Sequence, residues 1–270
     1  MTFNLSDNVD MAESAHFKDM YTYRTFCNYV LRTNRHMLDD NGQQFLDRLL
    51  SQADSRIRLI RKGEIFYRAQ LGSRPVRSGI QRVVVGQNLG QSAEKIAAPF
   101  TKKRMKPISG SATEGRVNSR GIPCLYVATD LYTAVAEMRG GLRQHVSVAT
   151  LRAKRNLRVI DCTTEEGCTR RGFVDMVIDH CVPNQRDNYV WQDVSEAFST
   201  PVLPSDMSAD YAPTQMIADA FKLREYDGVK YSSRLGTGAS VALFRVNDAT
   251  VVTVDLYEIA KIGIPELKPL

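Results

Sequence analysis

One segment of the chain carries three side chains with complementary chemistry at a defined spacing. Tyr126 follows Arg116 by ten positions, and Glu137 follows Tyr126 by eleven. A guanidinium offers a planar fork of donors that suits phosphate oxygens, and an aromatic ring can stack on a flat cationic group. A fixed carboxylate stabilises the positive charge that develops on a sugar when a glycosidic bond breaks. These groups could therefore bind a phosphorylated ligand and cleave a bond at its sugar.

Each of the three residues also has an ordinary structural interpretation. Arg116 could lie on a surface loop, and Tyr126 could fill the core from a strand. Glu137 could be an exposed helix residue that pairs with Arg139 or Arg143. All three alternatives stay open on these residues alone.

Common cofactor and nucleophile motifs are missing from the sequence. There is no GxxxxGK[ST] loop, no GxGxxG after a predicted strand and no GxSxG elbow. Residues 235–238 (LGTG) resemble a fragment of a dinucleotide loop, but a hairpin turn is the better interpretation. These absences argue against a dehydrogenase and against a P-loop ATPase.

The sequence around these residues resembles the RES domain family. The family segment G-R-x-N-x-x-G-x-P-x-x-Y corresponds to residues 115–126, and its T-A-x-x-E helix corresponds to residues 133–137. A later segment, Y-x-P-T-Q followed by D-G-x-x-Y-x-S, corresponds to residues 211–215 and 227–233. Both motifs occur in the family order, within a resemblance that covers about residues 64–244.

Two positions depart from the family pattern. Many relatives carry Trp where Val117 stands, and a family G-x-N segment is here Gly238-Ala-Ser240. Details of the substrate pocket are expected to differ near these positions.

The resemblance implies an ADP-ribosyltransferase-like fold and an enzyme that cleaves NAD between nicotinamide and ribose. It places Arg116, Tyr126, Glu137 and Ser233 in the catalytic site. In that chemistry Arg116 would bind the diphosphate, Tyr126 would stack on nicotinamide, and Glu137 would stabilise the ribosyl cation. Ser233 would orient the nicotinamide amide or a ribose hydroxyl. Ser232 is the fallback for that role, and a turn serine is the ordinary interpretation of both.

Three further residues are candidates for the NAD site. Arg68 is a second phosphate ligand by the resemblance, because the family places an arginine near the end of its first core strand. A structural ion pair is the alternative for Arg68. Asn118 and Thr214 are expected to fix loop geometry beside the ligand.

Hydrophobic spacing predicts mixed helices and strands without the alternation of a doubly wound fold, so α+β is the expected class. Residues 72–120 are rich in Gly, Ser, Pro and basic residues and are expected to be irregular. Helices are expected twice within residues 15–55, and at residues 130–139, 172–181, 190–198 and 213–223. Strands are expected at residues 58–60, 64–68, 124–128, 145–151, 157–161, 229–231, 241–244 and 250–254.

The resemblance adds an arrangement to these elements. We expect a split β-sheet core of the ADP-ribosyltransferase type with surrounding helices in a catalytic domain of residues 63–270, preceded by an N-terminal helical extension of residues 1–62.

The positive charge of the chain raises the question of an anionic partner. The formal net charge is +6, and part of it lies in the run Lys102, Lys103, Arg104 and Lys106. A solvated loop is the preferred interpretation of this run, and nucleic acid is not expected as a partner because no aromatic residues interleave it.

Metal, disulfide and membrane features are also not expected. The five cysteines lack CxxC spacing, which suits reduced thiols, and the four histidines show no metal-ligand pairing. The neighbours His180 and Cys181 are weak evidence for zinc. No apolar stretch is long enough to span a bilayer, and the first residues do not read as a signal peptide, so a cytoplasmic protein is expected.

NAD is therefore the expected substrate, with water or inorganic phosphate as acceptor. A free NAD-cleaving enzyme would harm its host cell, so the resemblance implies a toxin held by a cognate antitoxin or immunity protein. The N-terminal helices could dock that partner, pair two copies of the chain, or cap the catalytic domain. Two alternatives stay open: a mono-ADP-ribosyltransferase that modifies a protein or nucleic acid, and a non-catalytic basic binding protein.

Overall fold

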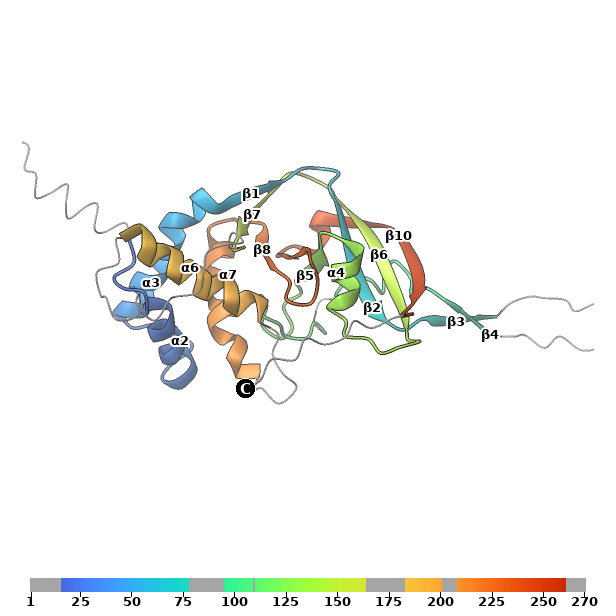
Figure 1. Cartoon of the computed structure of the whole chain (residues 1–270), viewed down its shortest axis with the longest axis horizontal. Helices are drawn as coiled ribbons and strands as arrows, with labels where there is room; N and C mark the ends of the chain where they lie inside the picture. Colours follow the sequence, from blue (N-terminus) through green and yellow to red (C-terminus); the bar gives the residue numbers. More distant parts are fainter. Residues whose placement is uncertain (1–15, 78–94, 109, 164–182, 201–207, 261–270) are drawn as a thin grey trace, which may run out of the picture.

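A computed structural model describes residues 16–77, 95–108, 110–163, 183–200 and 208–260. An eight-stranded sheet forms the centre, helices gather at one end, and a two-stranded ribbon projects from the other end (Figure 1). The predicted α+β class is confirmed.

The central sheet has the order β1-β7-β8-β9-β5-β2-β6-β10. Neighbouring strands are antiparallel except β7 and β8, which are parallel. Its strands are β1 (Ile57–Ile60), β2 (Ile65–Leu71), β5 (Leu125–Ala128), β6 (His145–Ala153), β7 (Leu157–Asp161), β8 (Gly228–Ser232), β9 (Ala239–Leu243) and β10 (Ala249–Glu258).

The sheet is nearly divided between β2 and β5. These two strands pair at one position, Tyr67 with Ala128, whereas β2 pairs with β6 along its whole length from Ile65 to Leu71. Strand β5 instead pairs with β9 from Leu125 to Ala128. The result is two half-sheets that meet at a narrow junction, which is the split core that the family resemblance implied.

Four longer helices cover one end of the sheet: α2 (Thr22–Arg32), α3 (Asp40–Ala53), α6 (Pro183–Ser199) and α7 (Ala212–Leu223). Local signals explain where two helices start. Asp39 caps α3 by accepting the Gly42 amide at 2.9 Å, and Pro213 stands in the first turn of α7, where its missing N–H is tolerated. The short helix α4 (Leu131–Ala136) lies against β2 near the junction of the half-sheets.

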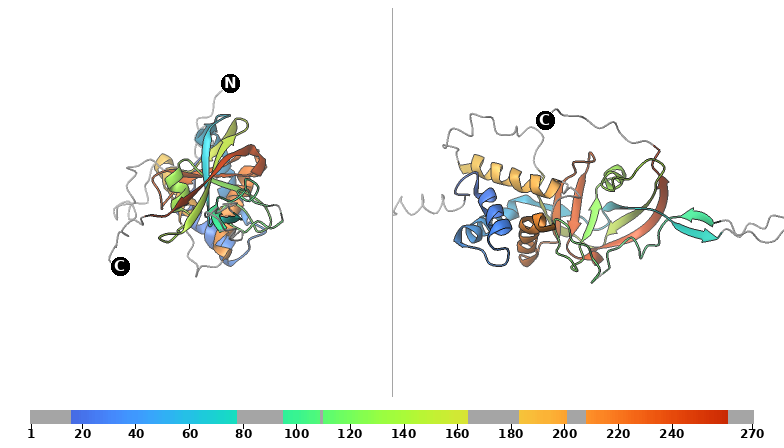
Figure 2. Two further views of the ribbon diagram at one scale, coloured as in Figure 1. Left: turned by 90° about the vertical axis from the view of Figure 1, so that its right-hand side faces the viewer. Right: turned by 90° about the horizontal axis from the view of Figure 1, so that it is seen from below.

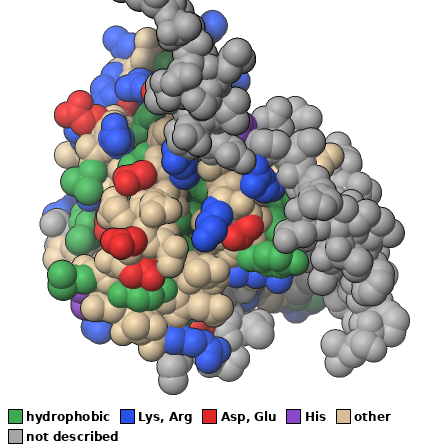
Figure 3. All heavy atoms as spheres, turned by 90° about the vertical axis from the view of Figure 1, so that its left-hand side faces the viewer, with side chains coloured by type: hydrophobic (Ala, Val, Ile, Leu, Met, Phe, Trp, Pro, Cys, Tyr) green, Lys and Arg blue, Asp and Glu red, His purple; other side chains and the backbone are tan. Residues whose placement is uncertain are grey.

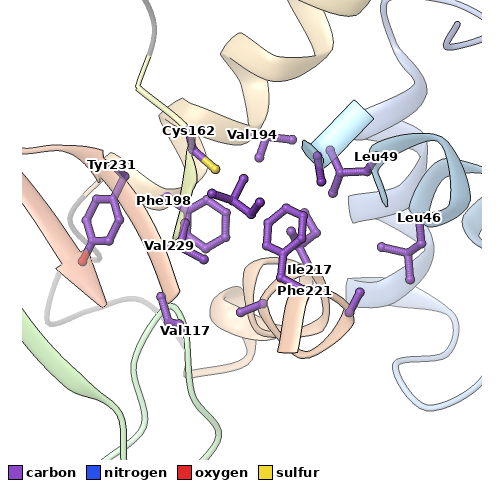
Figure 4. Close-up of a cluster of buried hydrophobic side chains, with 14 of the residues drawn as sticks. Leu46, Leu49, Val117, Cys162, Val194, Phe198, Ile217, Phe221, Val229 and Tyr231 are labelled. Carbon is purple, nitrogen blue, oxygen red and sulfur yellow. The ribbon is translucent and has the colours of Figure 1, made fainter. Parts of the chain in front are cut away.

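The four helices and the half-sheet of β7, β8 and β9 share one hydrophobic core (Figure 4). Leu46 and Leu49 of α3 face Ile217 and Phe221 of α7 across this core. The N-terminal helices therefore pack into the same interior as the later helices, and β1 is an edge strand of the central sheet. The predicted boundary at residue 62 stays a prediction, and no gap in packing marks it.

Most predicted elements are confirmed, although several bounds differ: the helix predicted at 190–198 is α6, which begins at Pro183. Two further differences have a clear cause. The helix predicted over residues 130–139 ends at Ala136, because Arg139 adopts a positive φ of 48° that breaks the helix. Residues 72–120 include the strands β3 (Arg74–Arg77) and β4 (Lys95–Ala98), so the prediction of an irregular segment was wrong there. The end of β3 at Arg77 and the start of β4 at Lys95 are 18 positions apart, so no short turn motif in the sequence indicates that these strands form a hairpin.

Several sequence predictions lie partly or wholly outside the described residues, including the helix at 172–181 and the neighbours His180 and Cys181. Within the described residues, Cys27, Cys124 and Cys162 are free thiols, and no group of three metal-ligating side chains occurs. In the same part of the chain, no helix is long and apolar enough to cross a bilayer. The described residues also form the short 3-10 helices η1 (Asp54–Arg56), η2 (Ser208–Tyr211) and η3 (Val246–Asp248).

Candidate active site

A cavity of about 220 Å³ opens at the junction of the two half-sheets. Both junction strands contribute to its wall, and α4, the loop after Glu114 and the start of α7 close it. Because β2 and β5 pair at one position only, their side chains diverge and leave this space between them. Its lining residues are Tyr67, Arg68, Ala69, Gly115, Arg116, Tyr126, Val127, Ala128, Ala134, Glu137, Met138, Tyr211, Tyr231 and Ser240.

Glu137 stands at the C-terminal end of α4 and lines the cavity. The Ser233 hydroxyl donates a hydrogen bond to Glu137 Oε1 at 2.7 Å. The same hydroxyl oxygen accepts the amides of Leu235 and Gly236, both at 3.1 Å. The carboxylate is therefore fixed in position, and among the described residues it forms no ion pair with Arg139 or with Arg143.

The turn between β8 and β9 carries Ser233 and packs closely on the start of α4. The Gly238 amide donates to Thr133 Oγ1 at 2.9 Å, and Thr133 is held in turn by the helix-capping Asp130. A Cβ atom at Gly236 would overlap Thr133, and one at Gly238 would overlap the Asp130 carboxylate. Residues 235–238 are thus a hairpin turn, as predicted, and their glycines permit the close approach.

Arg116 projects from a tight turn between Gly115 and Asn118. Its Nη1 donates to the Phe198 carbonyl at 2.9 Å, and its guanidinium lies 5.9 Å from the centre of the Tyr231 ring. The Arg116 Nε is buried and has no hydrogen-bond partner within the described part of the chain. A buried unpaired donor is costly, so a ligand oxygen at this position would stabilise the site.

Tyr126 ties the same turn to β5. Its hydroxyl donates to Asn118 Oδ1 at 2.7 Å and accepts the Val117 amide at 3.1 Å. Burial raises the pKa of Tyr126 well above its usual value, so the hydroxyl stays protonated and can donate. A Cβ at Gly115 would lie 2.6 Å from this hydroxyl, which explains why glycine occupies that position.

Gln215 of α7 joins the Arg116 turn to the helical end of the molecule. Its Nε2 donates to the carbonyls of Gly115 at 2.8 Å and Asn118 at 3.0 Å. Its Oε1 accepts the Ser119 hydroxyl at 3.3 Å. One side chain therefore holds both ends of the turn that presents Arg116.

Arg68 lies on β2 at the opposite wall of the cavity. Its Nη1 donates to the Tyr126 carbonyl at 2.8 Å, and its Nε is buried without a hydrogen-bond partner among the described residues. Burial lowers the pKa of Arg68, and the guanidinium remains charged because its ordinary pKa is so high. No carboxylate within the described ranges pairs with it, so the ion-pair alternative finds no support.

The structure places the predicted site residues in three groups. Four line the cavity (Arg68, Arg116, Tyr126 and Glu137), whereas Ser233 and Asn118 reach it through hydrogen bonds to Glu137 and Tyr126. Ser232 is directed elsewhere, because it lines a separate cavity with Arg58 and Lys230.

Thr214 Oγ1 donates to the Tyr211 carbonyl at 3.0 Å, which holds the turn that enters α7. Sequence reasoning missed the cavity residues Tyr67, Tyr211 and Tyr231. Two of them stand inside the quoted motifs, so the motif positions themselves were the available signal.

A family model described as the RES domain matches residues 91–260 of the chain. No curated protein matches the sequence. Among solved structures, the chain is similar to one described as the crystal structure of the M. tuberculosis MbcT-MbcA toxin-antitoxin complex, at 15% identity and a TM-score of 0.36. That alignment covers 78% of this chain and 91% of the other.

Proposed function

This chain belongs to the RES domain family, and we propose that it is an enzyme that cleaves NAD at the bond between nicotinamide and ribose. The acceptor is water or inorganic phosphate. The observation that carries this proposal is the fixed Glu137 carboxylate in the wall of a cavity that also holds two cationic guanidinium groups.

The two guanidinium groups suit the diphosphate of NAD. Arg68 and Arg116 both line the cavity, and each uses one Nη on a backbone carbonyl while its buried Nε has no partner in the described residues. Unpaired cationic donors favour an anionic oxygen ligand, and a guanidinium can bind phosphate oxygens through two donors at once.

The size of the cavity suits one end of the dinucleotide. Sites for whole drug-sized ligands span roughly 300–1,000 Å³, and this cavity of about 220 Å³ is smaller. Nicotinamide and its ribose would enter it, and the adenosine end would remain outside. Tyr67 and Tyr126 line the space and are the aromatic candidates for contact with the cationic pyridinium ring. The Tyr231 ring is already stacked on Phe198 and lies under the Arg116 guanidinium.

The reaction breaks one bond and forms one bond at the ribose. The bond from C1′ to the pyridinium nitrogen breaks, and its electron pair stays on the nitrogen, so neutral nicotinamide leaves. Positive charge develops on the ribose, and Glu137 stabilises it more in the transition state than in bound NAD. Water or phosphate then attacks C1′, and a proton of the attacking water passes to solvent. The products are ADP-ribose or its 1-phosphate.

A product assay with purified protein tests this proposal. Glu137→Gln should lower kcat by at least about 100-fold, since it removes the charge that the transition state needs. Glu114→Gln is the control, at an exposed glutamate that precedes the loop carrying Arg116, and it should leave turnover unchanged. Turnover in Glu137→Gln equal to that of the wild type would disprove the role of this carboxylate.

The same assay identifies the acceptor. Incubation with and without inorganic phosphate should give ADP-ribose 1-phosphate or ADP-ribose as a free product. Label from NAD that stays on a protein or nucleic acid would favour a mono-ADP-ribosyltransferase. No NAD consumption under any condition would favour a non-catalytic binding protein.

We also propose that the chain is the toxin of a toxin-antitoxin pair and requires an inhibitory partner. Loss of NAD would harm the cell that makes the enzyme, so an antitoxin that covers the cavity is expected. Expression of the wild type alone should arrest growth, and expression of Glu137→Gln should not.

A further inference from the structure

A two-stranded ribbon extends from the end of the molecule opposite the helices (Figures 1 and 2). Strand β3 pairs with β4 in an antiparallel register from Arg74 with Ala98 to Arg77 with Lys95. Among the described strands, neither pairs with any other, so both outer edges of the ribbon are open. An isolated two-stranded ribbon is marginally stable in water, which favours a structure that is completed by a partner.

Positive charge is concentrated in this part of the chain. Residues 65–113 contain nine Lys or Arg residues and one acidic residue, Glu94. We call β3, β4 and the following residues 101–106 the basic ribbon. Its cationic residues with described side chains are Arg74, Lys102, Lys103, Arg104 and Lys106. The sequence adds Arg77 and Lys95, which pair with each other in the ribbon.

The cations with described side chains are exposed and largely available to a ligand. Arg74, Lys102, Lys103 and Arg104 are all exposed, and within the described ranges none of them forms an ion pair. Arg74 donates to the Pro99 carbonyl at 2.9 Å. The Arg104 guanidinium lies 5.4 Å from the Phe100 ring centre. These contacts orient the side chains and leave their charges uncompensated.

The composition of the basic ribbon fits a nucleic acid better than an acidic protein. Protein interfaces depend on aromatic and large apolar anchors, whereas protein–DNA interfaces are more polar and strongly cationic. The basic ribbon exposes one large apolar side chain among its described residues, Ile96, at 49% of its surface. Phe100 lies beside the ribbon under Arg104 and is not free to stack on an unpaired base, which disfavours single strands.

We propose that the basic ribbon binds duplex DNA. The major groove of B-form DNA admits a two-stranded β-ribbon, whereas the major groove of duplex RNA is too narrow for side chains to enter. Cations on the ribbon and on residues 101–106 contact phosphates on both sides of the groove. Phosphate contacts should dominate the affinity, so duplexes of different base sequence should bind with similar strength.

The sequence interpretation of a solvated loop considered Lys102–Lys106 alone. It left out Arg74, Arg77 and Lys95, which the paired strands β3 and β4 bring together. The opposite end of the molecule differs, since basic and acidic side chains are interspersed over the α2, α3 and α6 helices (Figure 3). Positive charge on that face is balanced by nearby acidic side chains. Exposed cations away from the ribbon can therefore be changed as a control for net charge.

The test compares two variants with equal net charge. The ribbon variant carries Arg74→Gln, Lys102→Gln, Lys103→Gln and Arg104→Gln. The control variant carries Lys18→Gln, Arg32→Gln, Arg35→Gln and Lys62→Gln, at exposed positions away from the ribbon. Each variant lowers the formal net charge from +6 to +2. Fluorescence anisotropy measures binding to a short DNA duplex of random sequence, over a series of salt concentrations and without NAD.

The wild type and the control variant should bind the duplex with a steep salt dependence. The ribbon variant should bind at least about tenfold more weakly, and its slope of log K against log salt should be shallower by about 0.9 for each phosphate that it no longer neutralises. Equal weakening in both variants would show non-specific attraction and overturn the proposal. Equal or tighter binding to the single strand, to duplex RNA or to polyglutamate would also overturn it.

A folding control keeps the result interpretable. Both variants should keep the thermal unfolding midpoint of the wild type and its rate of NAD turnover, because none of the eight residues lines the cavity. Since DNA binding is measured without NAD, failure of the proposed NAD cleavage would leave this inference standing.

Discussion

Ser233 is the residue that joins two distant parts of the candidate site. Its hydroxyl donates to Glu137 at the end of α4, while its oxygen accepts two amides from its own turn. A hydroxyl that makes all three hydrogen bonds is already committed to the protein. We therefore assign Ser233 the positioning of the carboxylate, in addition to any contact with the ligand.

Ser233→Ala should lower kcat more than it changes KM, because Glu137 would lose the bond that fixes it. We expect a decrease in kcat of about tenfold to 100-fold, within the range for loss of one oriented polar group in an active site. Steady-state kinetics with NAD measures both constants. Ser232→Ala is the matched control, since Ser232 lines a different cavity and should leave both unchanged. If Ser232→Ala lowered kcat and Ser233→Ala did not, Ser232 would be the serine that positions Glu137.

The residues of the candidate site could be predicted from the sequence better than the elements that carry them. The resemblance to the RES motif singled out Arg116, Tyr126 and Glu137, and the fold brings all three to one cavity. Tyr67 could not be identified in this way, because it lies outside both motifs and becomes part of the cavity wall only where the two half-sheets meet. Ser232 and Ser233 are adjacent in sequence, and strand alternation sends neighbouring side chains to opposite faces.

At the level of elements, Gln215 couples α7 to the turn that presents Arg116. Gln215→Ala should raise KM for NAD about tenfold, because the turn loses both bonds from Gln215. It should lower the free energy of unfolding by about 0.5–1.5 kcal/mol, since the carbonyls of Gly115 and Asn118 keep their backbone hydrogen bonds to each other. Kinetics and urea titration measure the two effects.

Conservative changes separate positioning by Gln215 from general stability. Gln215→Glu retains the size and the acceptor for Ser119 but lacks the amide donor, so it should raise KM as Gln215→Ala does. Asp219→Asn, at an exposed position on the same helix, should have neither effect. A Gln215→Glu variant with normal KM would show that the donor bonds do not position the turn.

Elements with strong local patterns were predicted well, and the others were not. Strand β7 was predicted with its observed bounds because Leu157, Val159 and Ile160 form a short apolar segment rich in β-branched residues. Helix α4 ends early because of the backbone at Arg139, which the helical pattern did not reveal. The ribbon was not predicted because its two strands are far apart in the sequence, and no local pattern indicates that they pair.

For the whole molecule, the N-terminal helices are part of the main hydrophobic core. Phe26 of α2 stacks on Phe45 of α3 at 4.5 Å between ring centroids, and both belong to the core cluster shared with α6 and α7. Trp191 of α6 donates from Nε1 to Gln52 of α3 at 2.8 Å. The fold therefore depends on a segment that lies before the matched residues 91–260.

A chain that begins at residue 63 should fail to fold cooperatively. It lacks Phe17, Phe26, Phe45 and Leu49, which are almost fully buried. Burial of each such side chain contributes about 1.5–3 kcal/mol, and their sum is comparable with the total stability of a domain, about 5–15 kcal/mol. Circular dichroism during urea titration checks this. A cooperative transition at the wild-type midpoint would instead establish residues 1–62 as a separate extension.

The hydrogen bond between Glu137 and Ser233 joins residues 96 positions apart in the chain. Ribosomes add about 5–20 residues each second, so Ser233 is synthesised about 5–20 s after Glu137. A nascent chain that ends before the β8–β9 turn has the carboxylate and the Arg116 turn without the residue that fixes the carboxylate. Translation products that end before this turn should thus lack NAD turnover, and activity should begin only after the β8–β9 turn has emerged.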